Sequence, residues 1–234
     1  PQASPFFRHY MMGKDFIDRK PRYCIWLVGA DPGLLKKCPM ILERVNKVRE
    51  FRLSSTRANT KKAAENPTLF ASILEQYIAI PKVSSQNRRY IPMDYLDGEI
   101  IPGDKLFTMP NASFYEFGVL MSNVHMAWMR AVCGRLKSDY SYSNTIVYNN
   151  FPWPVVTEKN REQIEKSAQE ILKARTLYPS SNLAALYDPL TMPAELRRAH
   201  TANDKAVMAA YGFSTKMTEA DCVGELMKLY QKMQ

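Results

Sequence analysis

The chain has 234 residues, of which 46% are hydrophobic and 24% are charged, and its formal net charge is +9. This composition is ordinary for a globular protein, and its apolar runs are too short to cross a bilayer, so we expect no membrane segment. The four cysteines are scattered without a Cys-x-x-Cys pair, which favours reduced thiols in a cytoplasmic protein over a zinc site.

The positive charge is concentrated in the first two-thirds of the chain. Residues 1–155 contain 21 Lys and Arg against 13 Asp and Glu, whereas residues 156–234 contain 11 against 10. Such an asymmetry is typical of a surface that binds a phosphate backbone. The chain opens Pro-Gln-Ala-Ser-Pro, without Met and without an apolar leader, which indicates a piece of a longer protein.

The first part of the chain mixes strand and helix patterns. Runs rich in β-forming residues predict strands at 22–28, 76–85, 88–96, 104–110 and 142–149. Helical spacing predicts a helix at 38–55, with Pro39 near its start, and one long helix at 111–136. Each of the strands at 76–85 and 88–96 contains a proline, which favours edge positions, and we expect these two to pair.

The segment Phe-Pro-Trp-Pro-Val-Val-Thr at 151–157 separates two parts of the chain, since alternate prolines fit neither a helix nor a central strand. Beyond it, helices are predicted after the caps Thr157 and Thr218, and between Pro193 and Gly212. The predicted fold is α+β, a mixed sheet with helices at residues 1–155, followed by an all-α segment at residues 156–234.

Catalytic motifs are missing from the sequence. It contains no glycine-rich phosphate loop, no Gly-x-Ser-x-Gly and no His-Glu-x-x-His, and His125 lies among Met and Trp residues as a core histidine does. The acidic cluster Asp94, Asp97, Glu99 and Asp104 lacks the lysine spacing of a nuclease, and an Asp- and Gly-rich turn explains it more simply. We therefore expect neither a catalytic residue nor a metal site in this chain.

Two segments are dense in side chains that donate hydrogen bonds to phosphate and sugar. The first, at 81–92, supplies Lys82, Ser84, Ser85, Asn87, Arg88 and Arg89. The second, at 52–62, supplies Arg52, Arg57, Lys61 and Lys62. Either segment alone fits a solvated loop, but together with the charge asymmetry they predict a nucleic-acid-binding face, to which Arg135 is added.

Four segments resemble consecutive landmarks of the MmeI-like type II restriction–modification enzymes. They are "RYCIWLV" (22–28), "PKVSSQNRRYIP" (81–92), "HMAWMRAVCGRLKSDYSYSNTIVYNNFPWP" (125–154) and "LAALYDPLTMPAELRRAHTANDKAVMAAYGF" (183–213). The resemblance covers nearly the whole chain. It implies a DNA target recognition domain at 1–155 and a C-terminal helical domain at 156–234.

The resemblance also implies what lies outside this chain. The parent would be a bacterial adenine-N6 DNA methyltransferase that flips its target base, with or without an endonuclease. The Asn-Pro-Pro-Tyr-type and S-adenosylmethionine glycine motifs are absent here. The chain itself would therefore bind no cofactor, while the parent would use S-adenosylmethionine, with Mg²⁺ as a second candidate. The expected partners are double-stranded DNA and the upstream methyltransferase domain.

Lys137 and Asp139 are the residues for which the resemblance implies base recognition. Alternate residues of an extended segment point the same way, so both side chains would face one base pair. Lysine donates to guanine O6 and N7, and aspartate accepts from cytosine N4, so the pair complements the major-groove edge of G·C. Ser141 would lie on the same face, and Lys105 is the candidate for a neighbouring base pair. The competing interpretation is a surface ion pair.

Two other functions stay open at this point. The chain is also compatible with a module that binds a separate protein subunit, or with a metal-dependent nuclease fragment built on the 94–104 carboxylates. The first predicts weak DNA binding that is insensitive to salt, and the second predicts cleavage of DNA that is lost on Asp94→Asn or Asp104→Asn.

Overall fold

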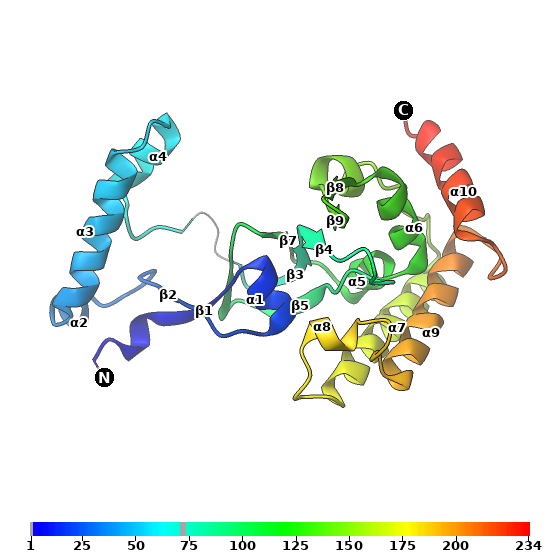
Figure 1. Ribbon diagram of the computed structural model, residues 1–234, viewed down its shortest axis with the longest axis horizontal. Helices are drawn as coiled ribbons and strands as arrows, with labels where there is room; N and C mark the ends of the chain where they lie inside the picture. Colours follow the sequence, from blue (N-terminus) through cyan, green and yellow to red (C-terminus); the bar gives the residue numbers. More distant parts are fainter. Residues whose placement is uncertain (1, 71–73) are drawn as a thin grey trace.

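A computed structural model describes residues 2–70 and 74–234, and it shows a helical lobe at one end and a larger body at the other (Figure 1). The lobe contains α2 (Pro32–Lys36), α3 (Pro39–Leu53), α4 (Ala58–Lys62) and the 3₁₀ turn η2 (Ala63–Glu65). The predicted helix at 38–55 is confirmed, with Pro39 in its first turn, where a missing N–H costs nothing. A small core around Phe6, Cys38 and Ile41 holds the lobe together.

A three-stranded sheet connects the lobe to the body. Its central strand β1 (Phe7–Met11) follows the 3₁₀ turn η1 (Ser4–Phe6) and pairs with β2 (Tyr23–Ile25) antiparallel and with β6 (Ile100–Pro102) parallel. The short helix α1 (Gly13–Asp18) lies between β1 and β2 in the chain. The predicted strand at 22–28 is confirmed only over the three residues of β2, whereas β1 and α1 were not predicted.

Two more antiparallel sheets lie in the body. One has the order β5 (Asp94–Asp97), β3 (Gln76–Pro81), β7 (Leu106–Pro110), and the other has the order β4 (Val83–Ser84), β9 (Asp139–Ser141), β8 (Gly134–Leu136). The predicted pairing of the 76–85 and 88–96 segments is confirmed only where β3 meets β5. Residues 88–93 form no strand, although Tyr90, Ile91 and Met93 are all buried.

The long helix predicted at 111–136 is wrong, because two helices occupy that segment. They are α5 (Phe114–Leu120) and α6 (Asn123–Val132). The break falls at Ser122, whose hydroxyl accepts a hydrogen bond from the main-chain N–H of His125 and so caps α6. A serine cap inside an otherwise continuous apolar pattern starts a new helix at a new angle.

The strand predicted at 142–149 is also wrong. Residues Asn144–Tyr148 form a short π-helical turn, η3, and the hydroxyl of Ser143 accepts from the N–H of Ile146 at its start. The carbonyl of Val147 accepts from the indole Nε1 of Trp128 at 2.9 Å, which fixes the turn against α6. The apolar residues alternate here because one side of the turn, at Val147, is buried. Serine and asparagine side chains bond to nearby main-chain groups, which favours a capped turn over a strand.

The C-terminal segment is helical, as predicted. It contains α7 (Glu158–Thr176), α8 (Leu183–Leu186), α9 (Ala194–Tyr211) and α10 (Glu219–Gln231). The predicted caps are confirmed, since the hydroxyl of Thr157 accepts from Asn160 N and that of Thr218 accepts from Asp221 N. Gly212 ends α9 with φ 70°, a left-handed conformation that glycine adopts without steric cost.

One hydrophobic core runs through both parts of the body. Helix α5 packs so closely on α7 and α9 that a Cβ atom at Gly118 would lie 2.6 Å from Cγ2 of Ile164. The fold class is therefore confirmed as α+β with small sheets, followed by helices that complete the same core. Within the described residues, no helix is both long enough and apolar enough to cross a bilayer.

His125 and His200 are buried in this core, and they make stability depend on pH. Burial lowers the pKa of the His125 imidazole to about 3 and holds the pKa of His200 well below 6.5. Both histidines stay neutral in the folded chain but take up protons in the unfolded chain below about pH 6.5. We therefore expect the free energy of unfolding to fall by about 1.4 kcal/mol per pH unit for each histidine as the pH drops below that value.

Urea denaturation at a series of pH values between neutral and mildly acidic measures this dependence. His125→Gln should flatten it by the contribution of one histidine. An unchanged slope in that variant would show that His125 titrates alike in the folded and unfolded chains.

Candidate nucleic-acid interface

The segment 134–141 is a β-hairpin with an exposed two-residue turn. Leu136 pairs with Asp139, so Lys137 and Ser138 make the turn, and Lys137 has φ 56°. Gly134 through Ser138 are all exposed. The expectation that Lys137 and Asp139 alternate along one extended strand is wrong, because a turn residue does not follow the side-chain alternation of the strands. Lys137 instead lies at the tip, and Asp139 begins the return strand.

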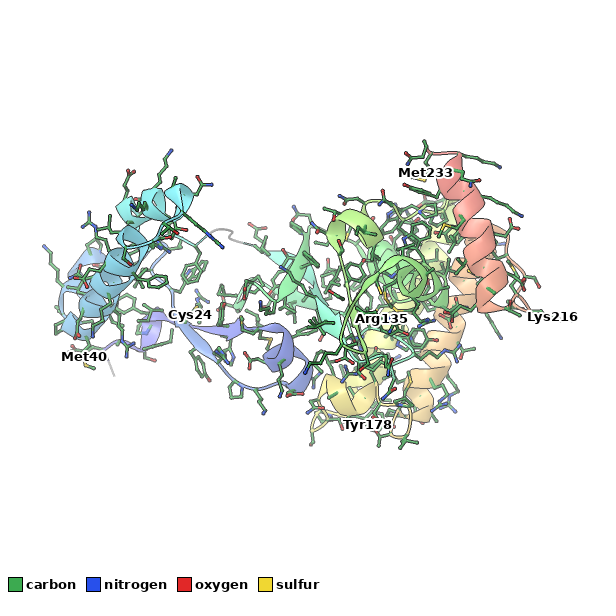
Figure 2. The ribbon with its side chains drawn as sticks, turned by 45° about the horizontal axis from the view of Figure 1, so that its top comes forward. Cys24, Met40, Arg135, Tyr178, Lys216 and Met233 are labelled. Atoms are coloured by element: carbon green, nitrogen blue, oxygen red, sulfur yellow. The ribbon has the colours of Figure 1, made fainter. Side chains whose placement is uncertain are left out.

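Arg135 shapes this hairpin. Its Nη1 donates to the carbonyl of Ser138 at 3.0 Å, and its guanidinium lies 4.1 Å from the centre of the Tyr140 ring. Figure 2 shows Arg135 on the larger body, far from Met40 in the helical lobe. Arg135 was expected to contact the DNA backbone, but in this structure one of its donors is used to hold the turn.

The first donor-rich segment lies directly beside the hairpin. Strand β4 pairs with β9, so that Val83 faces Ser141 and Ser84 faces Tyr140. One carboxylate oxygen of Asp139 accepts from the main-chain N–H of Gln86 at 3.4 Å. We call residues 82–89 the β4 loop. The structure thus brings the β4 loop and the hairpin, about fifty residues apart in the chain, onto one surface.

Lys82 joins this surface to β7. Its N–H donates to the carbonyl of Lys105 at 3.1 Å, and its carbonyl accepts from the N–H of Tyr142 at 2.8 Å. Lys105 is exposed, and its Nζ lies 3.5 Å from a carboxylate oxygen of the adjacent Asp104. The main chain of Lys105 is therefore adjacent to the β4 loop.

The predicted backbone contacts differ in exposure. Asn87 and Arg89 are exposed, and Lys82, Ser85 and Arg88 are half-buried. Ser84 is only 2% exposed, and its hydroxyl accepts from Nη1 of Arg88 at 3.5 Å. The hydroxyl of Ser84 is therefore placed to orient Arg88 and does not face solvent as a phosphate donor would.

The half-buried Arg88 remains a cation. Burial lowers the pKa of its guanidinium, and the nearby carboxylates of Asp139, Asp18 and Asp188 partly offset this effect. Because arginine starts from a pKa above 12, it stays protonated at neutral pH. Arg88 therefore contributes a fixed positive charge to the β4 loop.

A cleft of about 540 Å³ lies between the β4 loop and the C-terminal helices. Its lining includes Arg88, Arg89, Arg130, Thr218 and Glu219. Arg130 and Glu219 were not predicted as site residues, since nothing in their local sequence distinguishes them from other charged helix residues. Only the approach of α10 to α6 reveals them.

The second donor-rich segment lies elsewhere. Arg52, Arg57, Lys61 and Lys62 belong to the α3–α4 lobe, at the opposite end of the molecule from α9 and α10 (Figure 1). Nη1 of Arg52 donates to the carbonyls of Ala63 and Asn66 at 2.8 and 3.0 Å, so this side chain ties α3 to the segment after α4. Arg57, Lys61 and Lys62 are exposed. The two basic segments therefore do not form one continuous site within this chain.

The acidic residues at 94–104 do not form a metal site. Asp94 pairs with Arg175 at 3.0 Å, Glu99 pairs with Arg8, and a carboxylate oxygen of Asp97 accepts from the N–H of Glu99. In the described part of the chain, no group of three His, Cys, Asp or Glu side chains is placed to hold a metal ion. These contacts give the nuclease alternative no structural support.

Comparison with protein families matches both parts of the chain. The family described as "MmeI, target recognition domain" matches residues 1–155, and the family described as "MmeI, C-terminal domain" matches residues 156–234. The chain belongs to the MmeI family. The resemblance found from the sequence is therefore confirmed over the whole chain.

Two relatives that the chain matches are longer than the chain. It is 38% identical to "DNA methyltransferase A" of Bacillus subtilis (strain 168), with 100% of the chain matching 27% of that protein. It is 43% identical, with a TM-score of 0.93, to a solved structure of the type IIL restriction-modification enzyme MmeI in complex with DNA. That match covers 100% of this chain and 32% of the MmeI chain. The chain thus spans about a third or less of each relative.

Proposed function

We propose that this chain is the sequence-specific DNA recognition module of an adenine-N6 DNA methyltransferase or type II restriction–modification enzyme. The observation that carries the proposal is the exposed hairpin 134–141 beside the cationic β4 loop. The major groove of B-DNA admits a two-stranded β-ribbon, and flanking cations contact the phosphates on either side. The family membership and the DNA-bound relative support the same function.

Base recognition is proposed for the hairpin and its neighbour Lys105. Lys137 at the tip offers donors to guanine O6 and N7, and Asp139 offers an acceptor to cytosine N4. Because Lys137 lies in the turn and Asp139 begins β9, the two side chains are proposed to contact the same or adjacent base pairs. Ser141 lies two residues further along β9, and Lys105 immediately precedes β7.

Backbone contacts are proposed for the exposed and half-buried donors of the β4 loop. These are Lys82, Ser85, Asn87, Arg88 and Arg89. The exposed cations Arg57, Lys61 and Lys62 on the far lobe are proposed to contact DNA separately, further along the duplex. Arg135 and Ser84 are assigned to shaping the surface, since both use donors or acceptors within it.

The salt dependence of DNA binding tests this proposal. We expect the protein's affinity for duplex DNA to fall steeply with salt, because bound cations release counterions from the phosphates. Arg89→Gln should weaken binding to all sequences alike and reduce the slope of log K against log salt by about 1. Fluorescence anisotropy with labelled duplexes measures both quantities.

Lys216→Gln, a change of the same charge on the loop between α9 and α10, serves as the control (Figure 2). Binding that ignores salt in the wild type would favour a protein-binding module, and cleavage of the duplex by this chain in the presence of Mg²⁺ would favour the nuclease alternative.

The partner within the parent is proposed to be the methyltransferase domain, which would bring S-adenosylmethionine as its cofactor. The chain covers only 27% and 32% of its relatives, so most of the parent lies outside it. Met40 and Phe51, which lie three turns apart on the same side of α3, are 79% and 74% exposed. Exposed apolar side chains on one side of a helix are typical of an interface, and we assign this side of α3 to the rest of the same polypeptide.

A further inference from the structure

The C-terminal helices hold the β4 loop from two sides. These contacts join residues 1–155, which carry all the proposed DNA-binding residues, to residues 156–234, which carry none of them. Two side chains supply them: Asp204 on α9 and Glu219 on α10. Asp204 contacts Tyr90 and Arg89 directly, and Glu219 acts on Arg89 through Arg130. Tyr90 is the residue at which the chain leaves the loop and enters the core.

Asp204 fixes the buried end of the loop. It is 5% exposed, and one of its carboxylate oxygens accepts from the hydroxyl of Tyr90 at 2.7 Å, while the other accepts from the N–H of Asn123 at 2.7 Å. Nη2 of Arg89 lies 3.8 Å from the same carboxylate. The Tyr90 ring also stacks on His200 at 4.1 Å, so the chain has little freedom just after Arg89.

Arg130 transmits the position of α10 to the same end of the loop, at Arg89. Its Nε and Nη2 donate to the two carboxylate oxygens of Glu219 at 2.7 and 2.8 Å, and its Nη1 donates to the carbonyl of Arg89 at 3.0 Å. A guanidinium is planar, so a two-point bond to the carboxylate fixes the direction of its remaining donor. Glu219 therefore aims Arg130 at the main chain of Arg89.

Beyond β4, residues 85–89 depend on these contacts because their own main chain makes few. The N–H of Arg88 donates to the carbonyl of Ser85 at 3.2 Å, and the N–H of Gln86 donates to a carboxylate oxygen of Asp139 at 3.4 Å. Arg88 and Arg89 carry the charge that is proposed to meet phosphates. Holding those cations in their binding geometry before DNA arrives lowers the entropy that binding loses.

We propose that Arg130 and Glu219 are positioning residues, through which α10 sets the geometry of the β4 loop and hence the DNA affinity of the recognition module. This inference rests on the proposed function. It predicts an effect opposite in sign to simple charge attraction. Removing a carboxylate from a basic surface should strengthen DNA binding, but removing Glu219 should weaken it, because Arg130 then no longer holds Arg89.

The test uses the full-length protein that carries this chain and a labelled mixed-sequence DNA duplex. Glu219→Gln should weaken binding about tenfold, corresponding to the loss of one charge-assisted contact, and should reduce the salt slope by about 1. Arg130→Lys, which keeps the charge but loses the planar fork, should weaken binding in the same way. Thermal unfolding tests whether both variants fold. A variant that was only less folded would bind more weakly but would keep the wild-type slope of log K against log salt.

Glu225→Gln is the matched control. Glu225 lies on the same helix and pairs with Lys228 at 2.7 Å, away from the β4 loop, so this change should leave DNA binding equal or slightly stronger. If the wild type binds DNA and Glu219→Gln binds as tightly as Glu225→Gln, the positioning role is wrong. If the wild type itself shows no salt-dependent DNA binding, the proposed function fails instead.

Discussion

On the proposed function, exchanging Lys137 and Asp139 in the full-length protein is expected to change the base that is required at one or two positions of its recognition sequence. Each well-placed contact to a base edge discriminates by about 1–3 kcal/mol, which is roughly tenfold to over a hundredfold in affinity. The exchange reverses donor and acceptor at the hairpin, so a position that accepted G·C should then prefer the reversed pair. Sequencing that maps methylated adenines across a genome reads the outcome.

The hairpin should survive this exchange. Position 137 has φ 56°, a conformation that aspartate tolerates better than most residues, and position 139 is a strand residue that accommodates lysine, although a lysine there no longer accepts from the N–H of Gln86. A control exchange of Glu170 and Lys173, an exposed ion pair on α7, should leave every mapped site as it was. Unchanged methylation sites after the 137/139 exchange would rule out base readout by these two residues.

Arg175→Met is expected to lower the free energy of unfolding by about 3 kcal/mol. The Arg175 side chain is 3% exposed, and it donates to Asp94 at 3.0 Å and to the hydroxyl of Tyr187 at 2.9 Å. Removing it leaves the carboxylate of Asp94, which is 20% exposed, without its partner at the contact between α7 and β5. An unpaired, partly buried charge costs more than the pair itself contributed.

Chemical denaturation of the variants measures this loss. Lys173→Met, an exposed change on the same helix, should alter stability by less than about 0.5 kcal/mol. Adding Asp94→Leu to Arg175→Met should restore much of the loss, because an apolar pair of similar volume needs no charge partner. A single Arg175→Met variant as stable as the wild type would mean that solvent already screens the pair.

The local signals in the sequence predicted many of the elements but not all of their boundaries. Helices α3, α7, α9 and α10 were predicted because Pro39, Thr157, Gly212 and Thr218 act within one turn of the residues they cap or end. The break at Ser122 and the turn after Ser143 were missed for a related reason. In both places a capping serine interrupts an apolar pattern that, counted alone, favours a longer helix or a strand.

The candidate site was predicted as a set of residues but not as a surface. Lys137 and Asp139 were chosen from side-chain chemistry and a family resemblance, and the supposed alternation between them does not exist, because a two-residue turn separates the two strands. Arg52 was chosen for its charge, yet it ties two segments of the helical lobe together. A charged residue can be identified from the sequence, whereas the group to which it bonds cannot.

The sequence by itself determined the basic character of residues 1–155, the helical nature of residues 156–234 and the family to which both belong. These are properties of composition and of short-range spacing. The tertiary structure alone places Gln86 against Asp139, 53 residues away, and lets Arg130 join Glu219, 89 residues away, to Arg89, 41 residues away. Contacts at such separations form when packing of the shared core brings distant segments together, and no local pattern records them.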